Sequence, residues 1–238
     1  MATADKARRD QLKQFTARQT LHAHHRSRSV KDQWVWSVAA VVAVTISGLG
    51  LWAYSTIGPG KPATVADASV SEYREWTGEL VLRDATLDIT LDGASAPQAV
   101  ANFVDLNSRG YFDDSACHRL TTEGLFVVQC GDPLGLGIGN PGYTFGPLEN
   151  TPEDGVYPAG TLAMARASND ASSMGSQFFI VYEDSEIPDD IVGGYTVFGQ
   201  VTNGLDGFIK TYVEPGTADG STDGQPSIPA FIESITIR

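Results

Sequence analysis

The chain has 238 residues, of which 42% are hydrophobic, which is enough for one sizeable core or for one domain with an appendage. Its net charge of −13 is unevenly distributed: residues 1–33 hold eight Lys or Arg against three Asp, and the remainder carries −18. An acidic bulk of this kind argues against nucleic acid as the main partner.

The basic head, residues 1–33, needs a separate explanation. Beside an apolar stretch, such a cluster more often sets membrane topology or contacts acidic lipid headgroups than it binds nucleic acid. The histidine-rich tract His22–His25 is weak evidence for a metal site, because no second group of ligands accompanies it. The composition predicts a solvated, disordered segment.

The following 21 residues, 34–54, carry no charge. A helix of this length spans about 30 Å, the thickness of a bilayer's hydrocarbon core. Trp34 and Trp36 at one end and Trp52 and Tyr54 at the other occupy the positions that interfacial aromatics prefer. Positive residues flank only the N-terminal side, which predicts a single transmembrane helix with the head in the cytoplasm and the bulk outside. The alternative is a signal peptide cleaved after the small residues 63–66.

Residues 55–75 are rich in Gly, Pro, Ala and Ser and predict a linker. Alternating apolar and polar residues then predict antiparallel strands over 78–84 and 85–93. A helix is expected next, with Ser95 as its N-cap, Pro97 in its first turn and its end near Gly110.

A second helix is predicted over 203–213 and a closing strand over 230–238. Many short strands with two helices indicate a mainly β fold. We therefore expect residues 76–238 to form a closed antiparallel β-barrel capped by two helices.

The part of the chain beyond the apolar segment contains one histidine, His118, and neither a hydrolytic triad nor a metal-ligand cluster is apparent. The glycine-rich stretch 135–142 lacks the Lys-Ser/Thr ending of a phosphate loop and predicts a surface loop. These features disfavour hydrolases and cofactor enzymes, and we expect neither a cofactor nor a metal.

Five short stretches remain, and they occur in the order "APQAVANFVDL", "CHRLTTEGLFVVQCGDP", "GTLAMA", "GSQFFI" and "YTVFGQV". Together they resemble the cyclophilin family of peptidyl-prolyl cis-trans isomerases, over about residues 80–238. The combination "CHRLTTEG…QCGDP" is most similar to the cyclophilins of high-GC Gram-positive bacteria. Five stretches in the family's order are strong evidence, although each alone is weak.

The resemblance implies a site residue by residue. It makes Arg119 the catalytic arginine and Gln129 the glutamine that orients it or holds a substrate carbonyl. The substrate-binding residues that it implies are Phe126, Val127, Ala165, Arg166, Gln177, Phe179 and Tyr195.

Within this set, Phe126, Val127 and Phe179 correspond to the pocket for the proline ring. Gln177 and Phe179 should point to the same side of their strand, toward the cleft, because strand side chains alternate. The implied chemistry is a hydrogen bond from Arg119 to the proline nitrogen as the X-Pro bond twists.

Three departures from the family pattern are visible. Tyr195 replaces the pocket histidine of many members, Arg166 stands where the family often has asparagine, and the tryptophan of human-type members has no counterpart, Ile187 being nearest. The replacement at Tyr195 and the missing tryptophan predict weak cyclosporin binding.

The resemblance implies an isomerase that acts on Pro-containing peptides, and the predicted transmembrane helix adds a membrane tether and exported proteins as substrates. The alternative is a catalytically weak cyclophilin-fold module that holds Pro-containing segments of an envelope partner. Cys117 and Cys130 flank two strands that the resemblance pairs, but strand parity places their side chains on opposite faces and disfavours a disulfide between them.

Overall fold

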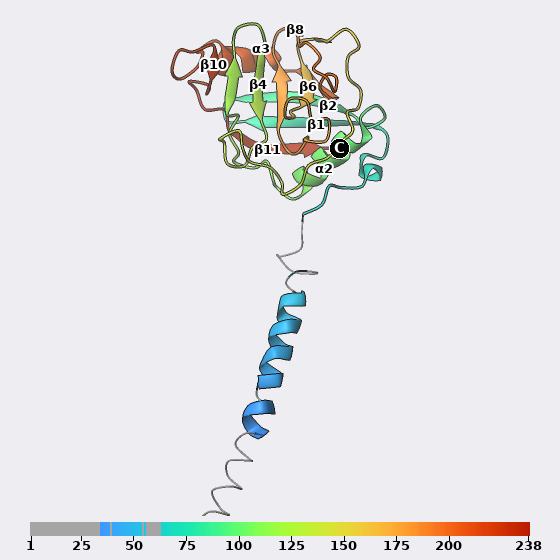
Figure 1. Ribbon diagram of the computed structural model, residues 1–238. Coiled ribbons are helices and arrows are strands. Elements are labelled where there is room, and N and C mark those ends of the chain that lie inside the picture. Colours follow the sequence, from blue (N-terminus) through green and yellow to red (C-terminus); the bar gives the residue numbers. More distant parts are fainter. Residues whose placement is uncertain (1–33, 39, 54, 56–62) are drawn as a thin grey trace, which may run out of the picture. The chain divides into compact units, whose positions relative to one another are not determined.

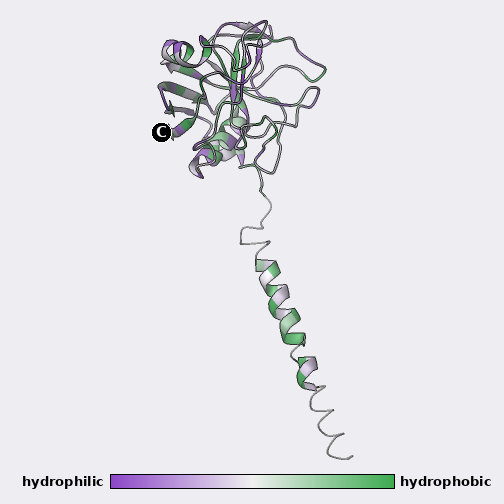
Figure 2. Cartoon of the chain, turned by 90° about the vertical axis from the view of Figure 1, so that its left-hand side faces the viewer, coloured by the Kyte–Doolittle hydropathy of each residue, from purple (hydrophilic) through white to green (hydrophobic). Residues whose placement is uncertain are grey.

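The computed structural model describes residues 34–38, 40–53, 55 and 63–238 (Figure 1). The chain divides into two compact units, 1–62 and 63–238, which are described separately. In the first unit the helix Trp34–Ala53 is long and apolar enough to cross a membrane, with a mean hydropathy of 1.9 (Figure 2). The basic head, residues 1–33, lies outside the described residues.

The second unit is built on a nine-stranded sheet with the order β10-β3-β4-β7-β6-β9-β2-β1-β11. Its strands are β1 (Glu75–Leu82), β2 (Ala85–Asp92), β3 (Arg119–Thr121), β4 (Val127–Cys130), β6 (Thr161–Met164), β7 (Phe178–Val181), β9 (Val197–Asn203), β10 (Asp223–Gly224) and β11 (Ile232–Ile237). A separate antiparallel pair is formed by β5 (Val156–Tyr157) and β8 (Ser185–Glu186).

The expected closed barrel is replaced by a curled sheet with two edges. In Figure 1, β4 and β6 run across β1, β2 and β11, and the edge strands β10 and β11 are not paired with each other. The segment 114–117 joins β11 instead. The Asp114 amide donates to the Ile232 carbonyl (2.8 Å), and the Cys117 amide donates to the Ala230 carbonyl (2.9 Å). The mainly β fold predicted from the sequence is present, but strand-to-strand closure is not.

Two helical segments cover the sheet. Helix α2 (Pro97–Ser108) begins where predicted, but Ser95 does not cap it. The Glu149 carboxylate instead accepts the amides of Gln98 (3.1 Å) and Ala99 (3.0 Å), placing a negative charge at the positive end of the helix dipole. Helix α3 (Leu205–Phe208) continues as the π-helical turn η2 (Ile209–Val213), matching the second predicted helix.

Residues 63–75, which the sequence analysis assigned to the linker, belong to the folded unit. They contain the 3₁₀ turn η1 (Ala68–Ser71), whose Ser71 carbonyl accepts the indole N–H of Trp76 (2.7 Å). The Gln98 side chain on α2 donates to the Ala66 carbonyl (2.8 Å). Backbone polar groups of this stretch are therefore satisfied by the domain itself.

The strands separate two apolar clusters. The larger is the core between the sheet and the helices, and it includes Leu120, Val128, Phe178 and Ile180. The smaller is formed by Val127, Tyr157, Ala163, Phe179 and Val181. Since the two sets alternate along β4 and β7, they occupy opposite faces of the same strands.

Candidate active site

Four residues form a row across neighbouring strands on the face opposite the main core. Arg119 on β3 pairs with Gln129 on β4, Gln129 pairs with Phe179 on β7, and Phe179 pairs with Ala163 on β6. Direct cross-strand partners share a face of a sheet, with Cβ atoms about 5 Å apart. The register therefore places a guanidinium, an amide and an aromatic ring in one line.

Beside this row is a pocket of about 90 Å³. It is lined by Arg119, Leu125, Val127, Gln129, Ala165, Arg166, Phe179, Ile187 and Tyr195. Phe179 is 5% exposed, and its ring meets that of Tyr195 edge-on with the centroids 5.5 Å apart. The pocket thus has an apolar floor and an arginine at its rim.

Phe126, which the sequence analysis placed in this pocket, does not line it. Its ring packs against Tyr182, with the centroids 5.9 Å apart, beside the main core. Leu125 takes its place in the lining. Leu125 lies outside β4, which begins at Val127, so strand alternation does not predict its place in the lining.

Asp223 and Gln129 fix the side chain of Arg119. The Asp223 carboxylate accepts from Arg119 Nε (2.7 Å) and Nη2 (2.8 Å), and Gln129 Oε1 accepts from Nη1 (3.3 Å). The hydrogen bond between the charged groups raises the pKa of Arg119 and lowers the pKa of Asp223. Asp223 lies 104 residues from Arg119, and no motif of the sequence pointed to it.

Gln177 is held between Gln129 and a loop. Its Oε1 accepts from Gln129 Nε2 (2.8 Å), and its Nε2 donates to the Gly139 carbonyl (2.9 Å). The two amides therefore extend the hydrogen-bonded chain from Asp223 and Arg119 across the site. Gln177 lines a pocket of about 350 Å³ that also shares Gln129, Ala165 and Arg166 with the apolar pocket.

Arg166 binds a neighbouring loop with its side chain, which is only 1% exposed. It donates to the carbonyls of Gly193 and Gly194 and to Asp190 Oδ2 (2.7 Å). Its guanidinium carbon lies 4.6 Å from the ring centre of Tyr195. The Arg166 hydrogen bond holds the pKa of Asp190 well below its usual range. Arg166 thus fixes Tyr195 and the pocket wall.

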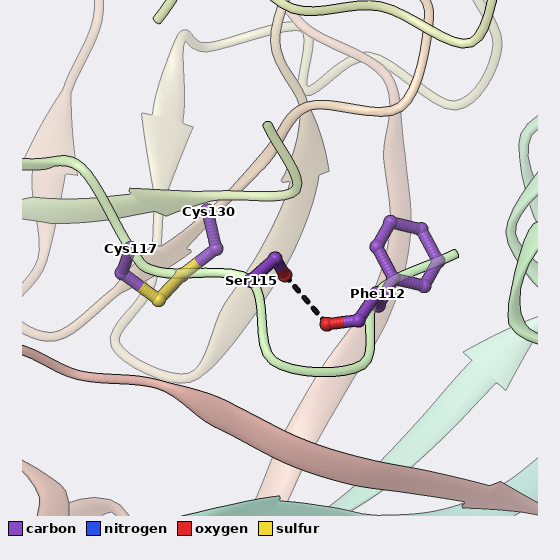
Figure 3. Close-up of a disulfide and its surroundings, with 4 residues drawn as sticks. All are labelled: Phe112, Ser115, Cys117 and Cys130. Carbon is purple, nitrogen blue, oxygen red and sulfur yellow. Dashed lines mark hydrogen bonds between the residues drawn. A yellow bond between two sulfur atoms is a disulfide. The ribbon is translucent and has the colours of Figure 1, made fainter. Parts of the chain in front are cut away.

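Cys117 and Cys130 form a disulfide, contrary to the parity argument (Figure 3). Alternation applies only within a strand, and β3 begins at Arg119, so Cys117 lies outside it. There the His118 amide donates to the Gln129 carbonyl (2.9 Å), while the Cys117 amide donates to Ala230. Both cysteines are buried, at 3% and 0% exposed.

His118 precedes Arg119 and is partly buried. Burial lowers the pKa of His118, an effect that Asp132 opposes and Arg119 adds to. Within the described part of the chain, its buried Nδ1 has no hydrogen-bond partner. Together with Arg119, Gln129 and Leu136 it lines a further pocket, of about 370 Å³.

The chain is similar in sequence and fold to known proteins. Residues 79–236 match the model of the family described as cyclophilin type peptidyl-prolyl cis-trans isomerase/CLD. Peptidyl-prolyl cis-trans isomerase B of Bacillus subtilis is 40% identical over 131 residues, which are 55% of this chain and 86% of that protein.

"Probable peptidyl-prolyl cis-trans isomerase B" of Mycobacterium tuberculosis is 38% identical over 188 residues, covering 74% of this chain and 56% of that protein. The chain thus spans little more than half the length of this relative. A solved structure of a Cryptosporidium parvum cyclophilin type isomerase, obtained with the dipeptide Ala-Pro, has a TM-score of 0.57 and 28% identity, covering 68% of this chain and 98% of that one. The family match, the relatives and the fold agree: this chain belongs to the cyclophilin-type peptidyl-prolyl cis-trans isomerase family.

Proposed function

We propose that the chain is a peptidyl-prolyl cis-trans isomerase whose reaction is carried by Arg119. The supporting observation is that an arginine fixed by two partners stands at the rim of a pocket floored by Val127 and Phe179. The pocket would hold a proline ring, and the guanidinium would then lie beside the X-Pro bond. The residues that line the pocket are sufficient for this step, which needs neither a nucleophile nor a metal.

An X-Pro bond rotates slowly because the nitrogen lone pair is delocalised into the carbonyl. In the twisted transition state the lone pair is localised on the proline nitrogen, which becomes a hydrogen-bond acceptor. A guanidinium has five N–H groups, and three are bound to Asp223 and Gln129. The remaining two are available to donate to the twisted bond, which stabilises the transition state more than the planar ground state.

The test is an isomerisation assay of the full chain in detergent on an X-Pro peptide. Arg119→Ala should reduce kcat/KM by about 100-fold or more, the size of effect seen when one donor to a transition-state charge is removed. Arg109→Ala is the matched control, because Arg109, directly after α2, also forms an ion pair with an aspartate, Asp105, and does not line the pocket. Circular dichroism must show that both variants are folded.

The assay also separates the second candidate, a module that binds Pro-containing segments with little turnover. A folded Arg119→Ala chain with the kcat/KM of the wild type would remove Arg119 from the mechanism. A wild-type chain that binds the peptide without accelerating its isomerisation would favour the binding module.

We further propose that the helix Trp34–Ala53 anchors the chain, with the head in the cytoplasm and the isomerase domain outside, acting on exported proteins. Its length, its apolar composition and the basic residues on its N-terminal side support this topology. The buried Cys117–Cys130 bond fits an oxidising compartment. Protease added to permeabilised envelopes should digest the domain and spare the head. A mature chain that begins near residue 67 would instead indicate a cleaved signal peptide.

Weak cyclosporin binding is proposed from the pocket wall. Ile187 and Tyr195 both line the pocket. The sequence resemblance makes Ile187 the nearest counterpart of the family's tryptophan and Tyr195 the replacement of its histidine. Ile187→Trp should therefore lower the cyclosporin concentration needed for half-inhibition. Tight inhibition of the wild-type chain would contradict the proposal.

A further inference from the structure

One loop beside the site exposes three large aliphatic side chains within five residues. Leu134, Leu136 and Ile138 are 63%, 66% and 74% exposed. Single exposed aliphatic residues are common on protein surfaces, but three in one short loop beside a pocket indicate a contact surface.

Hydrogen bonds of the loop backbone hold these three side chains in their exposed positions. Asp132 is fully buried, and its carboxylate accepts the amides of Leu134 (2.8 Å), Leu136 (3.0 Å) and Ile138 (3.0 Å). Burial opposes ionisation of Asp132, but hydrogen bonds from backbone amides of the loop, those of Leu134 and Leu136 among them, outweigh it and lower its pKa. A methyl group at Gly139 would lie 1.8 Å from Asp132 Oδ1, so only glycine fits there. With the three amides turned inward, the loop is held around one carboxylate.

Two of the three side chains form walls of the pockets next to Arg119. Leu136 lines the pocket of about 370 Å³ together with Arg119 and Gln129. Ile138 lines the pocket of about 350 Å³ together with Gln129 and Gln177. Leu134, equally exposed, lines neither of these two pockets. Gln129 also lines the apolar pocket, so a chain leaving that pocket past Gln129 meets Leu136 or Ile138.

The loop is also hydrogen-bonded, through Gln177, to the row of residues that contains Gln129 and Arg119. The Gly139 carbonyl accepts from Gln177, Gln177 accepts from Gln129, and Gln129 accepts from Arg119. A peptide that contacts the loop would therefore lie at a fixed position relative to the guanidinium of Arg119. This continuity distinguishes the loop from an isolated apolar patch.

We propose that Leu136 and Ile138 select extended, unfolded polypeptides that carry a large apolar side chain within a few residues of the proline. The proposal rests on the isomerase function proposed above and adds the class of client. The charge of the domain argues against an anionic membrane as the occupant, because residues 63–238 contain 26 Asp or Glu and only 7 Lys or Arg. Folded proteins bury their apolar segments, so this preference directs the enzyme to chains that have not yet folded.

The experiment measures kcat/KM by exchange NMR for serine-based peptides with one proline. Leucine is introduced singly at each of three positions on either side of the proline, and the readout is the ratio of kcat/KM for the leucine and the all-serine peptide. The full chain in detergent should show a ratio of about ten for at least one position, the size expected for partial burial of one leucine side chain. The double variant Leu136→Ser, Ile138→Ser should bring this ratio to about one.

Leu134→Ser is the matched control, because it removes an equally exposed side chain from the same loop and should leave the ratio at the wild-type value. The proposal is overturned by a wild-type ratio near one at every position, by a double variant that keeps the preference, or by an equal loss in Leu134→Ser. Loss of self-association in the double variant, without any flank preference in the wild type, would assign the loop to a second copy of the chain and also overturn it. A wild-type chain that isomerises none of the peptides would instead contradict the proposed function.

Discussion

The carboxylate of Asp223 accepts two parallel hydrogen bonds, of 2.7 and 2.8 Å, from the guanidinium of Arg119. The two residues are 104 positions apart and meet because β10 pairs with β3, with Asp223 opposite Thr121. Paired hydrogen bonds fix the plane of a guanidinium as well as its position. Asp223 therefore determines which N–H groups of Arg119 face the apolar pocket.

Removing this partner should impair the reaction without unfolding the domain, since both side chains are partly exposed. We expect Asp223→Ala to lower kcat about tenfold with little change in KM, because the arginine remains present but loses its orientation. Asp223→Asn keeps one acceptor and should be intermediate. Steady-state kinetics with thermal melting measure both. A loss confined to KM would show that Asp223 contacts substrate rather than positioning Arg119.

Arg119→Lys should be almost as inactive as Arg119→Ala. A lysine retains the charge but has no planar fork, so it cannot bind the Asp223 carboxylate and donate in a fixed direction to a twisted amide. The expected loss in kcat/KM is about 100-fold, measured in the isomerisation assay on the X-Pro peptide. A lysine variant within about threefold of wild type would mean that charge alone supports the reaction.

Phe179→Ala should weaken both binding and stability. The ring forms part of the pocket and is 5% exposed, so its removal should raise KM and lower the free energy of unfolding by about 3 kcal/mol. Phe179→Leu preserves most of the apolar volume and serves as the control for stability. Chemical denaturation and peptide kinetics separate the two effects. Unchanged KM in a folded alanine variant would restrict Phe179 to a structural role.

The Cys117–Cys130 bond should be formed in the mature protein and should stabilise it. Its cysteines are 13 positions apart, so the bond closes a short loop, and replacing both by alanine should lower the free energy of unfolding by about 3 kcal/mol. Thiol titration of the denatured, unreduced chain should find no free thiol. Two free thiols there would contradict the bond, whatever the stability of the variant.

His118 should make stability fall as the pH drops below about 6.5, toward the lowered pKa of this histidine in the folded protein. Its pKa is lowered in the folded protein, whereas the unfolded chain has an ordinary value of about 6.5. The unfolded state thus binds the proton more readily, so stability is full above about pH 6.5 and is lost as the pH falls toward the lowered pKa. The lowered pKa values of the neighbouring carboxylates Asp132 and Asp223 place their titration below this window.

The measurement is the Tm at pH 7.5 and at pH 5.5. Wild type should lose Tm between them, and His118→Gln should lose less, since glutamine has no proton to gain. An identical decrease in the two proteins would assign the pH dependence to other groups.

Local periodicity was enough to predict much of the fold. Strands over 78–84 and 85–93 are present as β1 and β2, and the helix expected from Pro97 is α2. The predictions that were wrong concern residues whose hydrogen-bond partners lie far away in the sequence. The cap of α2 is Glu149 rather than Ser95, and the predicted linker packs on the domain through contacts such as that of Gln98 with Ala66.

The same distinction holds at the site. Arg119, Val127, Gln129 and Phe179 are brought together where the motifs placed them. Asp223 was not predicted, because its role depends on pairing between β10 and β3 that no local pattern encodes. Phe126 was assigned to the pocket by counting residues along the motif, whereas Leu125, two residues before the start of β4, lines it. The functional roles of these residues remain predictions that the variants above examine.

The row Arg119, Gln129, Phe179 and Ala163 has a counterpart one residue along each strand. Leu120 pairs with Val128, Val128 with Ile180 and Ile180 with Leu162, and all four are fully buried in the main core. A one-residue slip in any of these strands would exchange a core side chain for a site side chain. Insertions are therefore excluded from the strands and confined to the loops between them, whereas substitutions can alter the pocket face while the core face keeps the fold.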